Sequence, residues 1–231
     1  NCVLTSGKSK FTLSTLSAAE YPNLESWQGE VEINLSRQQL RKLLEDTAFS
    51  MANQDVRYYL NGLLFEVDNG TLTAVATDGH RLAMSTLALP AVSGQQKQII
   101  IPRKGVLEIM RLLANDEQQV SLSLGQNHIR LTDSSFSFSS KLIDGRFPDY
   151  RRVLPRNSTK LVTAHRDVLK DSCVRASILS NEKYRGVRFT LSGQNELQIV
   201  ANNPEHEQAE EVIEVEYVGE TLEIGFNVSY L

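Results

Sequence analysis

The densest concentration of binding chemistry in the sequence lies between Asp144 and Pro155, where twelve residues include three arginines, two aromatic residues and two prolines. Proline fixes its own φ angle and restricts the residue before it, so the arginines stand on a stiff, extended support. Guanidinium groups on such a support suit phosphates or an acidic partner. The same composition also fits a solvated linker between two domains, and the segment alone leaves both interpretations open.

Two other groups of residues have types that catalysis uses. Asp78, His80 and His128 would suit a hydrolase site, and the Glu-His-Glu run at 205–207 a metal site. However, no Cys/His spacing fits zinc, no glycine-rich phosphate loop follows a strand, and no nucleophile elbow is present. Asp78 is better explained as holding its own turn, and 205–211 as a solvated acidic strand edge. We therefore expect no catalytic residue, metal or cofactor, and keep a metal-dependent hydrolase using Asp78 and His80 as the alternative.

Composition sets limits on the class of protein. A chain of 231 residues predicts one or two domains of roughly 100–150 residues each, and 41% hydrophobic residues suffice for a buried core. The net charge of −4 argues against a generally basic nucleic-acid binder but permits a local basic face. Cys2 and Cys173 are too far apart in sequence to suggest a disulfide framework or a zinc site, so a reducing cytoplasm is expected.

Targeting signals and chain ends give further expectations. No apolar run approaches the ~18 residues that a membrane span needs, and no signal peptide is visible. The chain opens without Met in what reads as a strand and stops where a helix begins, so we interpret it as a fragment of a longer protein.

Three helices are expected to position these groups. Ser36 followed by Gln39 is a capping-box pattern, and apolar residues then recur at helical spacing to Met51. This predicts a helix of about four turns over 37–51. Its outer face would carry the cations Arg37, Arg41 and Lys42. The other two helices are expected at 104–114 and from about Arg166.

Short strands are expected between the helices. Residues 63–67 and 72–76 flank Asp68-Asn69-Gly70, a hairpin turn signal, and residues 135–139 alternate as a half-buried strand does. Further strands are predicted at 31–35, 97–101, 197–200, 212–217 and 222–226. Few helices and many strands joined by tight turns favour an α+β fold with antiparallel sheets over a doubly wound parallel one.

The sequence also repeats itself. Residues 38–53 match residues 166–181 in apolar pattern, and in both places a strand that opens with glycine follows. The helices are offset by 128 residues and the strands by 124. Within the first unit, strand 97–101 and helix 104–114 restate strand 31–35 and helix 37–51. So long a period indicates duplicated domains in a symmetric assembly and excludes a solenoid.

Six runs in order along the chain resemble one known family: DVRYYLNG (55–62), ATDGHRL (76–82), IPRKG (101–105), DGRFPDYRRVLP (144–155), ILSNEK (178–183) and GFNVSY (225–230). They resemble the bacterial sliding clamps, the β subunits of replicative DNA polymerase III, in their γ-proteobacterial form. The resemblance implies the DNA-clamp fold, in which repeated domains of antiparallel sheets carry two helices each. Two subunits of three such domains close head to tail into a ring around DNA.

The resemblance also implies domain boundaries. Residues 1–28 would be the end of the first clamp domain with its linker, 29–153 the complete second domain, and 154–231 part of the third. Residues of the family's C-terminus that complete its peptide groove would be missing.

Three sites follow from the resemblance. The implied DNA-binding residues are Gln54, Arg57, Tyr58, Tyr59, Arg103, Lys104, Arg146 and Arg152. The implied groove for partner peptides consists of Leu60, Thr77, Gly79, His80, Arg81, Leu82, Pro148, Val153, Asn227 and Tyr230. The implied ring interface consists of Phe11, Leu13, Ile178 and Leu179.

The function implied is that of a non-enzymatic, cytoplasmic processivity factor that tethers replicative and repair polymerases to DNA. Its expected partners are double-stranded DNA of any sequence, DNA polymerases, the clamp loader and a second copy of itself, with no membrane. A peptide-binding module without a DNA role stays open as a second alternative beside the hydrolase.

Overall fold

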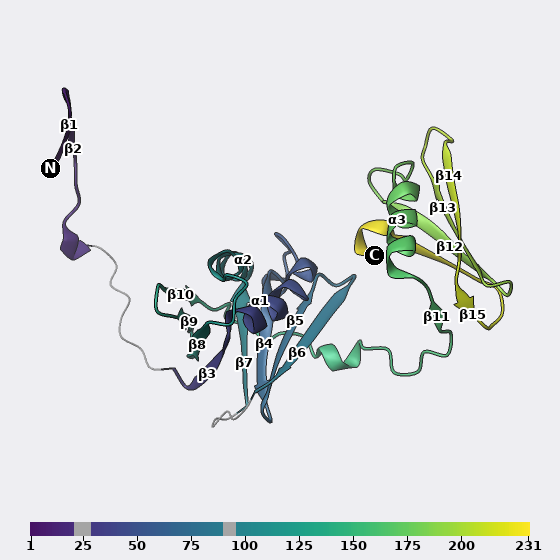
Figure 1. The fold of residues 1–231 in the computed structure, drawn as a ribbon, viewed down its shortest axis with the longest axis horizontal. Helices are drawn as coiled ribbons and strands as arrows, with labels where there is room; N and C mark the ends of the chain where they lie inside the picture. The colour runs from purple at the N-terminus through teal and green to yellow at the C-terminus, as the bar shows by residue number, and fades with distance from the viewer. Residues whose placement is uncertain (21–28, 90–95) are drawn as a thin grey trace.

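Antiparallel pairing joins every strand in the computed structural model, which describes residues 1–20, 29–89 and 96–231 (Figure 1). The helical segments are α1 (Arg37–Glu45), α2 (Arg103–Leu112), α3 (Arg166–Ser177) and the 3₁₀ turns η1 (Ala18–Glu20), η2 (Ala48–Ser50), η3 (Tyr58–Leu60), η4 (Tyr150–Arg152) and η5 (Val228–Tyr230). The strands are β1 (Cys2–Ser6), β2 (Ser9–Leu13), β3 (Val31–Ser36), β4 (Gly62–Asp68), β5 (Thr71–Thr77), β6 (Leu82–Ala88), β7 (Lys97–Pro102), β8 (Gln119–Leu124), β9 (His128–Thr132), β10 (Ser137–Lys141), β11 (Val162–Thr163), β12 (Gly186–Ser192), β13 (Glu196–Asn202), β14 (Gln208–Glu214), β15 (Glu216–Tyr217) and β16 (Leu222–Asn227). The predicted α+β class with antiparallel sheets is confirmed.

The middle of the chain forms two four-stranded sheets, in the orders β10-β9-β8-β3 and β6-β5-β4-β7. The sheets meet where the chain leaves β10, because the Ile143 amide donates a hydrogen bond to the Ile100 carbonyl at 2.9 Å. Helix α1 follows β3 directly and α2 follows β7 directly, and the two helices pack side by side (Figure 1). The predicted repetition of a strand–helix unit is thus confirmed.

The β6-β5-β4-β7 sheet is apolar on both faces. Along β4, Leu63 and Phe65 point into the main core, which the helices α1 and α2 cover. Leu64 points to the opposite face, into a second apolar cluster with Phe147 and Tyr150 from the segment that follows β10. Since successive strand residues alternate between faces, one strand can supply both clusters.

Helix α1 is shorter than the pattern predicts. The capping box of Ser36 and Gln39 forms as expected, but the helix ends at Glu45, so the expected four turns are wrong. The Thr47 hydroxyl donates to the Leu43 carbonyl at 2.8 Å and thereby satisfies one of the last carbonyls of the helix. Ala48 and Met51 are still buried, because the 3₁₀ turn η2 carries them into the same core.

Two predicted strands also have different limits. The strand expected at 135–139 begins only at Ser137, since the Asp133 carboxylate accepts hydrogen bonds from the amides of Ser135 and Phe136 and closes a turn there. The strand expected at 212–217 is divided into β14 and β15 at Val215, whose amide donates to the Asn195 carbonyl.

The long repeat is confirmed in the C-terminal part of the chain. The sheet order β14-β13-β12-β16 reproduces β6-β5-β4-β7, and α3 packs on this sheet, contacting β13 and β14. The hairpin predicted at Asn69 and Gly70 has φ angles of 46° and 73°, which two-residue hairpin turns require.

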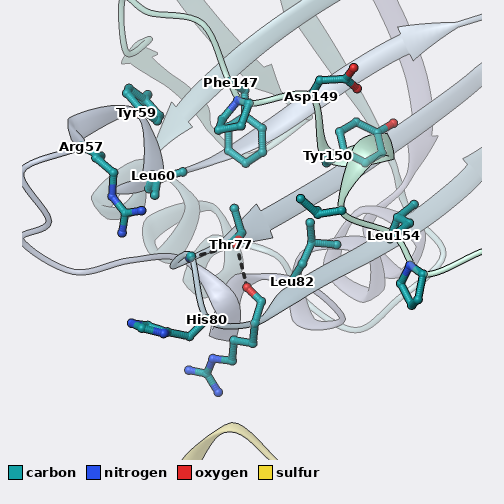
Figure 2. A pocket seen from close by; sticks show the side chains of 15 residues that line it. Arg57, Tyr59, Leu60, Thr77, His80, Leu82, Phe147, Asp149, Tyr150 and Leu154 are labelled. Atoms are coloured by element: carbon teal, nitrogen blue, oxygen red, sulfur yellow. Dashed lines mark hydrogen bonds between the residues drawn. The ribbon is translucent and has the colours of Figure 1, made fainter.

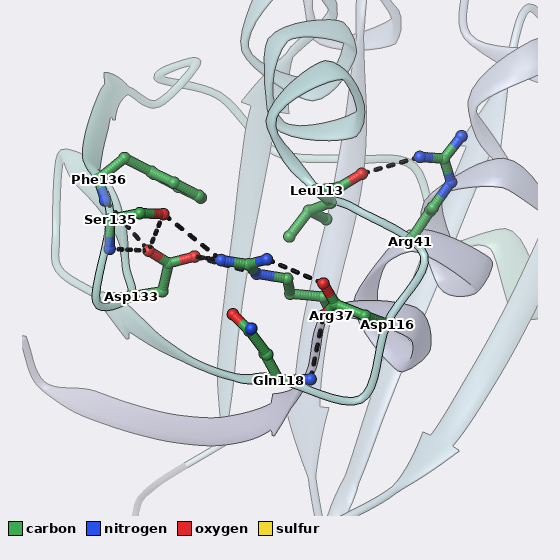
Figure 3. Close-up of polar contacts among 8 residues, drawn as sticks. All are labelled: Arg37, Arg41, Leu113, Asp116, Gln118, Asp133, Ser135 and Phe136. Carbon is green, nitrogen blue, oxygen red and sulfur yellow. Dashed lines mark hydrogen bonds and ion pairs between the residues drawn. The ribbon is translucent and has the colours of Figure 1, made fainter.

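A polar network ties α1 to the turns around it (Figure 3). Arg37 is only 8% exposed, which corrects its expected place on an outer helix face. Its guanidinium donates to Asp133 (Nε, 3.0 Å) and to Asp116 (Nη1, 3.0 Å). Arg41 donates to the Leu113 carbonyl at 2.8 Å, so these arginines hold the helix in place.

The Asp133 carboxyl is strongly stabilised in its ionised form. Burial alone would raise the pKa of Asp133, but hydrogen bonds from the Ser135 amide and the Arg37 guanidinium outweigh burial and lower the pKa from 3.8 to about 2. A carboxyl with a depressed folded-state pKa stabilises the fold above its ordinary pKa. That stabilisation is lost as the pH falls from about 4 towards 2.

We expect Asp133→Asn to lower the free energy of unfolding at pH 7 by about 3 kcal/mol, because Arg37 loses its main buried partner. The variant should also lose less stability than the parent chain between pH 4 and 2. Denaturant titrations across this pH range measure both effects, with the exposed Asp144→Asn as the matched control. Identical pH profiles for the parent and Asp133→Asn would contradict this role.

Candidate functional site

A groove of about 500 Å³ lies where the turn between β5 and β6 meets the segment that follows Arg146 (Figure 2). Eight of the ten residues predicted for a peptide groove line it: Leu60, Thr77, Gly79, His80, Arg81, Leu82, Pro148 and Val153. The prediction missed five lining residues, Phe147, Asp149, Tyr150, Leu154 and Pro155, and two more, Arg57 and Tyr59, had been assigned to DNA.

The apolar part of the groove rests on the outer face of the β6-β5-β4-β7 sheet. Leu60 is 2% exposed and belongs with Phe147 and Tyr150 to the second apolar cluster, against which Leu82 and Leu154 pack. Val153 also lines the groove and remains 68% exposed. An open pocket with an apolar floor suits leucine or phenylalanine anchors of a short peptide.

The turn from Thr77 to Arg81 forms the polar rim of the groove. One oxygen of the Asp78 carboxylate accepts hydrogen bonds from the amides of His80 (2.9 Å) and Arg81 (3.0 Å). The Thr77 hydroxyl donates to the Arg81 carbonyl at 2.7 Å. Burial would raise the pKa of Asp78, but the amide hydrogen bonds outweigh it and lower the pKa.

This geometry gives Asp78 the structural role predicted for it and leaves a hydrolase site unsupported. Its carboxylate is engaged by backbone amides, and His128 opens β9 in the other sheet. At 205–207, Glu207 instead closes a turn by accepting a hydrogen bond from the side chain of Asn203 at 2.6 Å. The described residues hold no cluster of three or more His, Cys, Asp or Glu side chains placed to bind a metal ion.

Arg57 lies in the wall of the groove. Its guanidinium donates to Asp55 (Nε, 3.0 Å; Nη2, 2.8 Å) and to the Asp78 carbonyl (3.2 Å). The hydrogen bonds from Arg57 lower the pKa of Asp55 to about 2. The signal in the sequence is the aspartate two residues before the arginine, which holds the side chain locally.

Of the two C-terminal residues predicted to border the groove, only Tyr230 contacts its rim. The Tyr230 ring stacks on His80 with centroids 5.5 Å apart, and the Arg81 guanidinium lies 5.2 Å from the Tyr230 centroid. Arg81 also donates to the Ser229 carbonyl at 3.2 Å. Asn227 instead accepts the Ser229 amide hydrogen bond and caps η5.

Most residues predicted to contact DNA lie on adjoining segments. The Tyr58 ring is 56% exposed, packs edge to face with Tyr59 (5.7 Å), and lies beside Gly145.

Arg103 opens α2, and its guanidinium donates to the Met51 carbonyl at 3.3 Å. Three further candidates are exposed: Gln54, Lys104 and Arg146. Arg152 is exposed in η4 and pairs with Asp149 at 3.0 Å.

The residues predicted for a ring interface lie on two separate parts of the chain. Phe11 and Leu13 are 58% and 48% exposed on the β1–β2 hairpin, in which every residue is exposed. Ile178 is 75% exposed at the end of α3, and Leu179 is half-buried beside it. Three of these four apolar side chains are therefore exposed, and Leu179 is partly so.

A buried carboxylate beneath the groove was not predicted. Glu66 on β4 is 1% exposed and accepts hydrogen bonds from three side chains: Tyr150 Oη (2.7 Å), Arg151 Nη2 (2.5 Å) and Gln98 Nε2 (2.5 Å). Burial alone would raise the pKa of Glu66, but these hydrogen bonds outweigh it and lower the pKa. A glutamate inside the apolar run GLLFEVD is the sequence signal that would have identified it.

Within residues 1–20, 29–89 and 96–231, no helix has the length and apolar content needed to cross a membrane.

Two family models match consecutive parts of the chain. One, described as DNA polymerase III beta subunit, central domain, matches residues 34–149. The other, described as DNA polymerase III beta subunit, C-terminal domain, matches residues 151–231. Together they cover nearly all of the three four-stranded sheets in the part of the chain that the structure describes, and the β1–β2 hairpin lies outside both.

Named relatives agree with the family models. The chain is 56% identical over 234 residues to the beta sliding clamp of Proteus mirabilis and 53% identical over 229 residues to that of Escherichia coli. It is similar to the crystal structure of the DNA polymerase III subunit beta from Pseudomonas aeruginosa, with a TM-score of 0.92 and 53% identity. A structure of the sliding clamp from the same species bound to griselimycin matches with a TM-score of 0.91. In each case the match covers 99% of this chain but only 62% of the relative.

We expect Gly79→Ala to destabilise the protein by about 1–2 kcal/mol, because Gly79 has a φ of +89° and a Cβ there would lie 2.9 Å from Arg57 Nη1. Gly186→Ala is the matched control, since a Cβ at that position meets no atom within 4 Å. Denaturant unfolding of both variants tests this, and equal losses of stability would show that the turn at Gly79 has no special constraint.

Proposed function

Because the chain belongs to the DNA polymerase III beta subunit family, we propose that it forms part of a DNA sliding clamp, a processivity factor that encircles duplex DNA. The family models that cover residues 34–149 and 151–231 support this. The proposed domains are 1–28 from the end of the first clamp domain, 29–153 as the second, and 154–231 as part of the third.

The groove is the observation that carries the proposed docking function. Eight residues predicted from the sequence line one cavity with an apolar floor and a polar rim. Polymerases and a clamp loader would dock there through short peptides with leucine and phenylalanine anchors. A ring that encircles DNA converts a modest affinity for such a peptide into a high effective concentration of polymerase at the template.

The proposed DNA contacts suit a protein that slides. Arg103, Lys104 and Arg146 would meet phosphates without reading bases, on a chain whose net charge is −4. A sparse set of cations on an acidic body keeps each contact weak and exchangeable. Arg57 is better assigned to the groove, because Asp55 and the Asp78 carbonyl occupy its guanidinium.

The assembly we propose is a head-to-tail pair of full-length subunits. The exposed Phe11, Leu13 and Ile178, with the half-buried Leu179, would meet across the boundary between subunits. The function is topological and non-catalytic, performed in the cytoplasm, and needs no cofactor.

We expect a peptide with leucine and phenylalanine anchors to bind saturably and to bind about fivefold more weakly to Val153→Ala, which removes exposed groove surface without disturbing the core. Leu60→Ala should weaken binding about tenfold, because it removes part of the groove floor. Fluorescence anisotropy with a labelled peptide measures these affinities.

The matched control for the peptide titration is Val212→Ala, since Val212 is 53% exposed on β14 outside the groove. Equal effects of Val153→Ala and Val212→Ala would place the peptide elsewhere. Absence of binding to the parent chain and to the protein completed at its C-terminus would refute the docking function.

We expect DNA association to fall steeply with salt, and Lys104→Ala or Arg103→Ala to reduce the slope of log K against log salt by about one each. Anisotropy of a labelled duplex across a salt series measures this. Lys42→Ala is the control, because Lys42 pairs with Asp46 on the exposed face of α1. A slope unchanged by either substitution would assign the phosphate contacts to other residues. Peptide binding without any salt-dependent DNA association would favour a peptide-binding module without a DNA role.

A further inference from the structure

The groove wall formed by residues 147–155 is attached to the sheet almost entirely through side chains. In the described part of the chain, its backbone hydrogen bonds join Arg152 to Asp149 and Val153 to Tyr150, so both are internal to the wall. Before the wall, the last backbone hydrogen bond to the sheet is made by Ile143, whose amide donates to the Ile100 carbonyl. Between these points, contacts of side chains must determine where the wall stands.

Apolar contacts alone do not specify one position for this wall. Phe147 and Tyr150 are each 5% exposed and bury their rings on the outer face of the sheet. Hydrophobic contact is non-directional, so it specifies the orientation of these rings less strictly than a hydrogen bond does. A directional contact is needed to define the register of η4 and of the groove residues that follow it.

Glu66 provides this directional contact. It projects from β4 on the face that the wall covers, beside its cross-strand partner Gln98 on β7. One oxygen accepts hydrogen bonds from Tyr150 Oη and Arg151 Nη2, two successive residues of η4. The Arg151 guanidinium also lies over the Tyr150 ring, 4.7 Å from its centroid. Two donors converging on one buried oxygen define both the position and the orientation of η4.

The groove depends on this position because the residues on either side of the contact line it. Tyr150 of the hydrogen-bonded pair lines the groove, as do Asp149 before the pair and Val153 and Leu154 after it. Glu66 itself does not line the groove and would act only through Tyr150 and Arg151.

We propose that Glu66 is the positioning residue of the peptide groove: its buried carboxylate holds η4 in register and thereby keeps the wall 147–155 in its binding position. The expected effect of Glu66 on peptide affinity rests on the proposed docking function. Its expected effect on the position of η4 rests on the geometry of η4 alone. A wall held before binding lowers the ordering cost of the complex.

Two variants test the contact. Glu66→Gln keeps the shape of the side chain and removes the charge that Arg151 requires. Tyr150→Phe removes a single hydrogen bond and leaves the ring in the groove wall, so it serves if Glu66→Gln fails to fold. Asp133→Asn is the matched control, because it also removes a buried, arginine-paired carboxylate, but one that follows β9 in the other four-stranded sheet and does not line the groove.

The first measurement is the affinity for the labelled peptide. Glu66→Gln and Tyr150→Phe are expected to weaken it at least about fivefold, and Asp133→Asn less than about twofold. The double variant should lose no more than the larger single loss, because both changes remove one shared contact. Equal losses in all three variants, or no loss in the first two, would overturn the proposal.

The second measurement does not require a ligand. Amide hydrogen exchange of Arg152 and Val153 should accelerate more in Glu66→Gln and Tyr150→Phe than in Asp133→Asn, relative to the change in global stability of each variant. If the parent chain binds no peptide, the docking function fails while the exchange rates still decide whether Glu66 positions the wall. Unchanged exchange in both groove variants would show that apolar packing alone places η4.

Discussion

Burial of the β6-β5-β4-β7 sheet on both faces is the constraint on which the groove depends. Leu63 and Phe65 face the helices, while Leu64 faces outward and requires a cover of its own. The chain supplies that cover after β10, through Phe147 and Tyr150. This covering segment forms one wall of the groove, and the turn from Thr77 to Arg81 forms its rim.

Electrostatic pairing explains how the segment 147–155 can carry arginines and still hold a defined position on the sheet. Burying a carboxylate is costly unless donors compensate for the lost water, and Glu66 is compensated by Tyr150, Arg151 and Gln98. Burial and the hydrogen bond to Glu66 raise the pKa of Tyr150 to about 12, so the hydroxyl keeps its proton as a donor. The arginine density that stands out between Asp144 and Pro155 therefore has divided roles. Arg151 has a structural partner, whereas Arg146 is exposed.

The sequence predicted what depends on local pattern and missed what depends on distant partners. The capping box at Ser36 and the hairpin at Asn69 were visible because each is set by neighbours in sequence, and the repeat was visible because the same local pattern occurs twice. The buried state of Arg37 was not, since its partner Asp133 is 96 residues away. The same holds for Glu66 and Tyr150, separated by 84 residues. Most lining residues of the groove were predicted from the family resemblance, because a known family fold already brings residues distant in sequence together.

The internal repeat shows why one sheet forms this groove and its counterpart is built differently. Strand β12 repeats β4 with glycine first and phenylalanine fourth, and both strands are paired centrally in sheets of the same order. The outward positions differ, because Leu64 and Glu66 correspond to Arg188 and Thr190. Arg188 is exposed and lies 4.0 Å from Glu223 on β16, so this position is solvated. An apolar residue at the first position creates the need for a cover, and a buried carboxylate at the second gives that cover one place to bind. Leu64 and Glu66, the two outward side chains of β4 that differ from the repeat, both contact the groove wall, together with Val75 and Ile100 of the neighbouring strands in the case of Leu64.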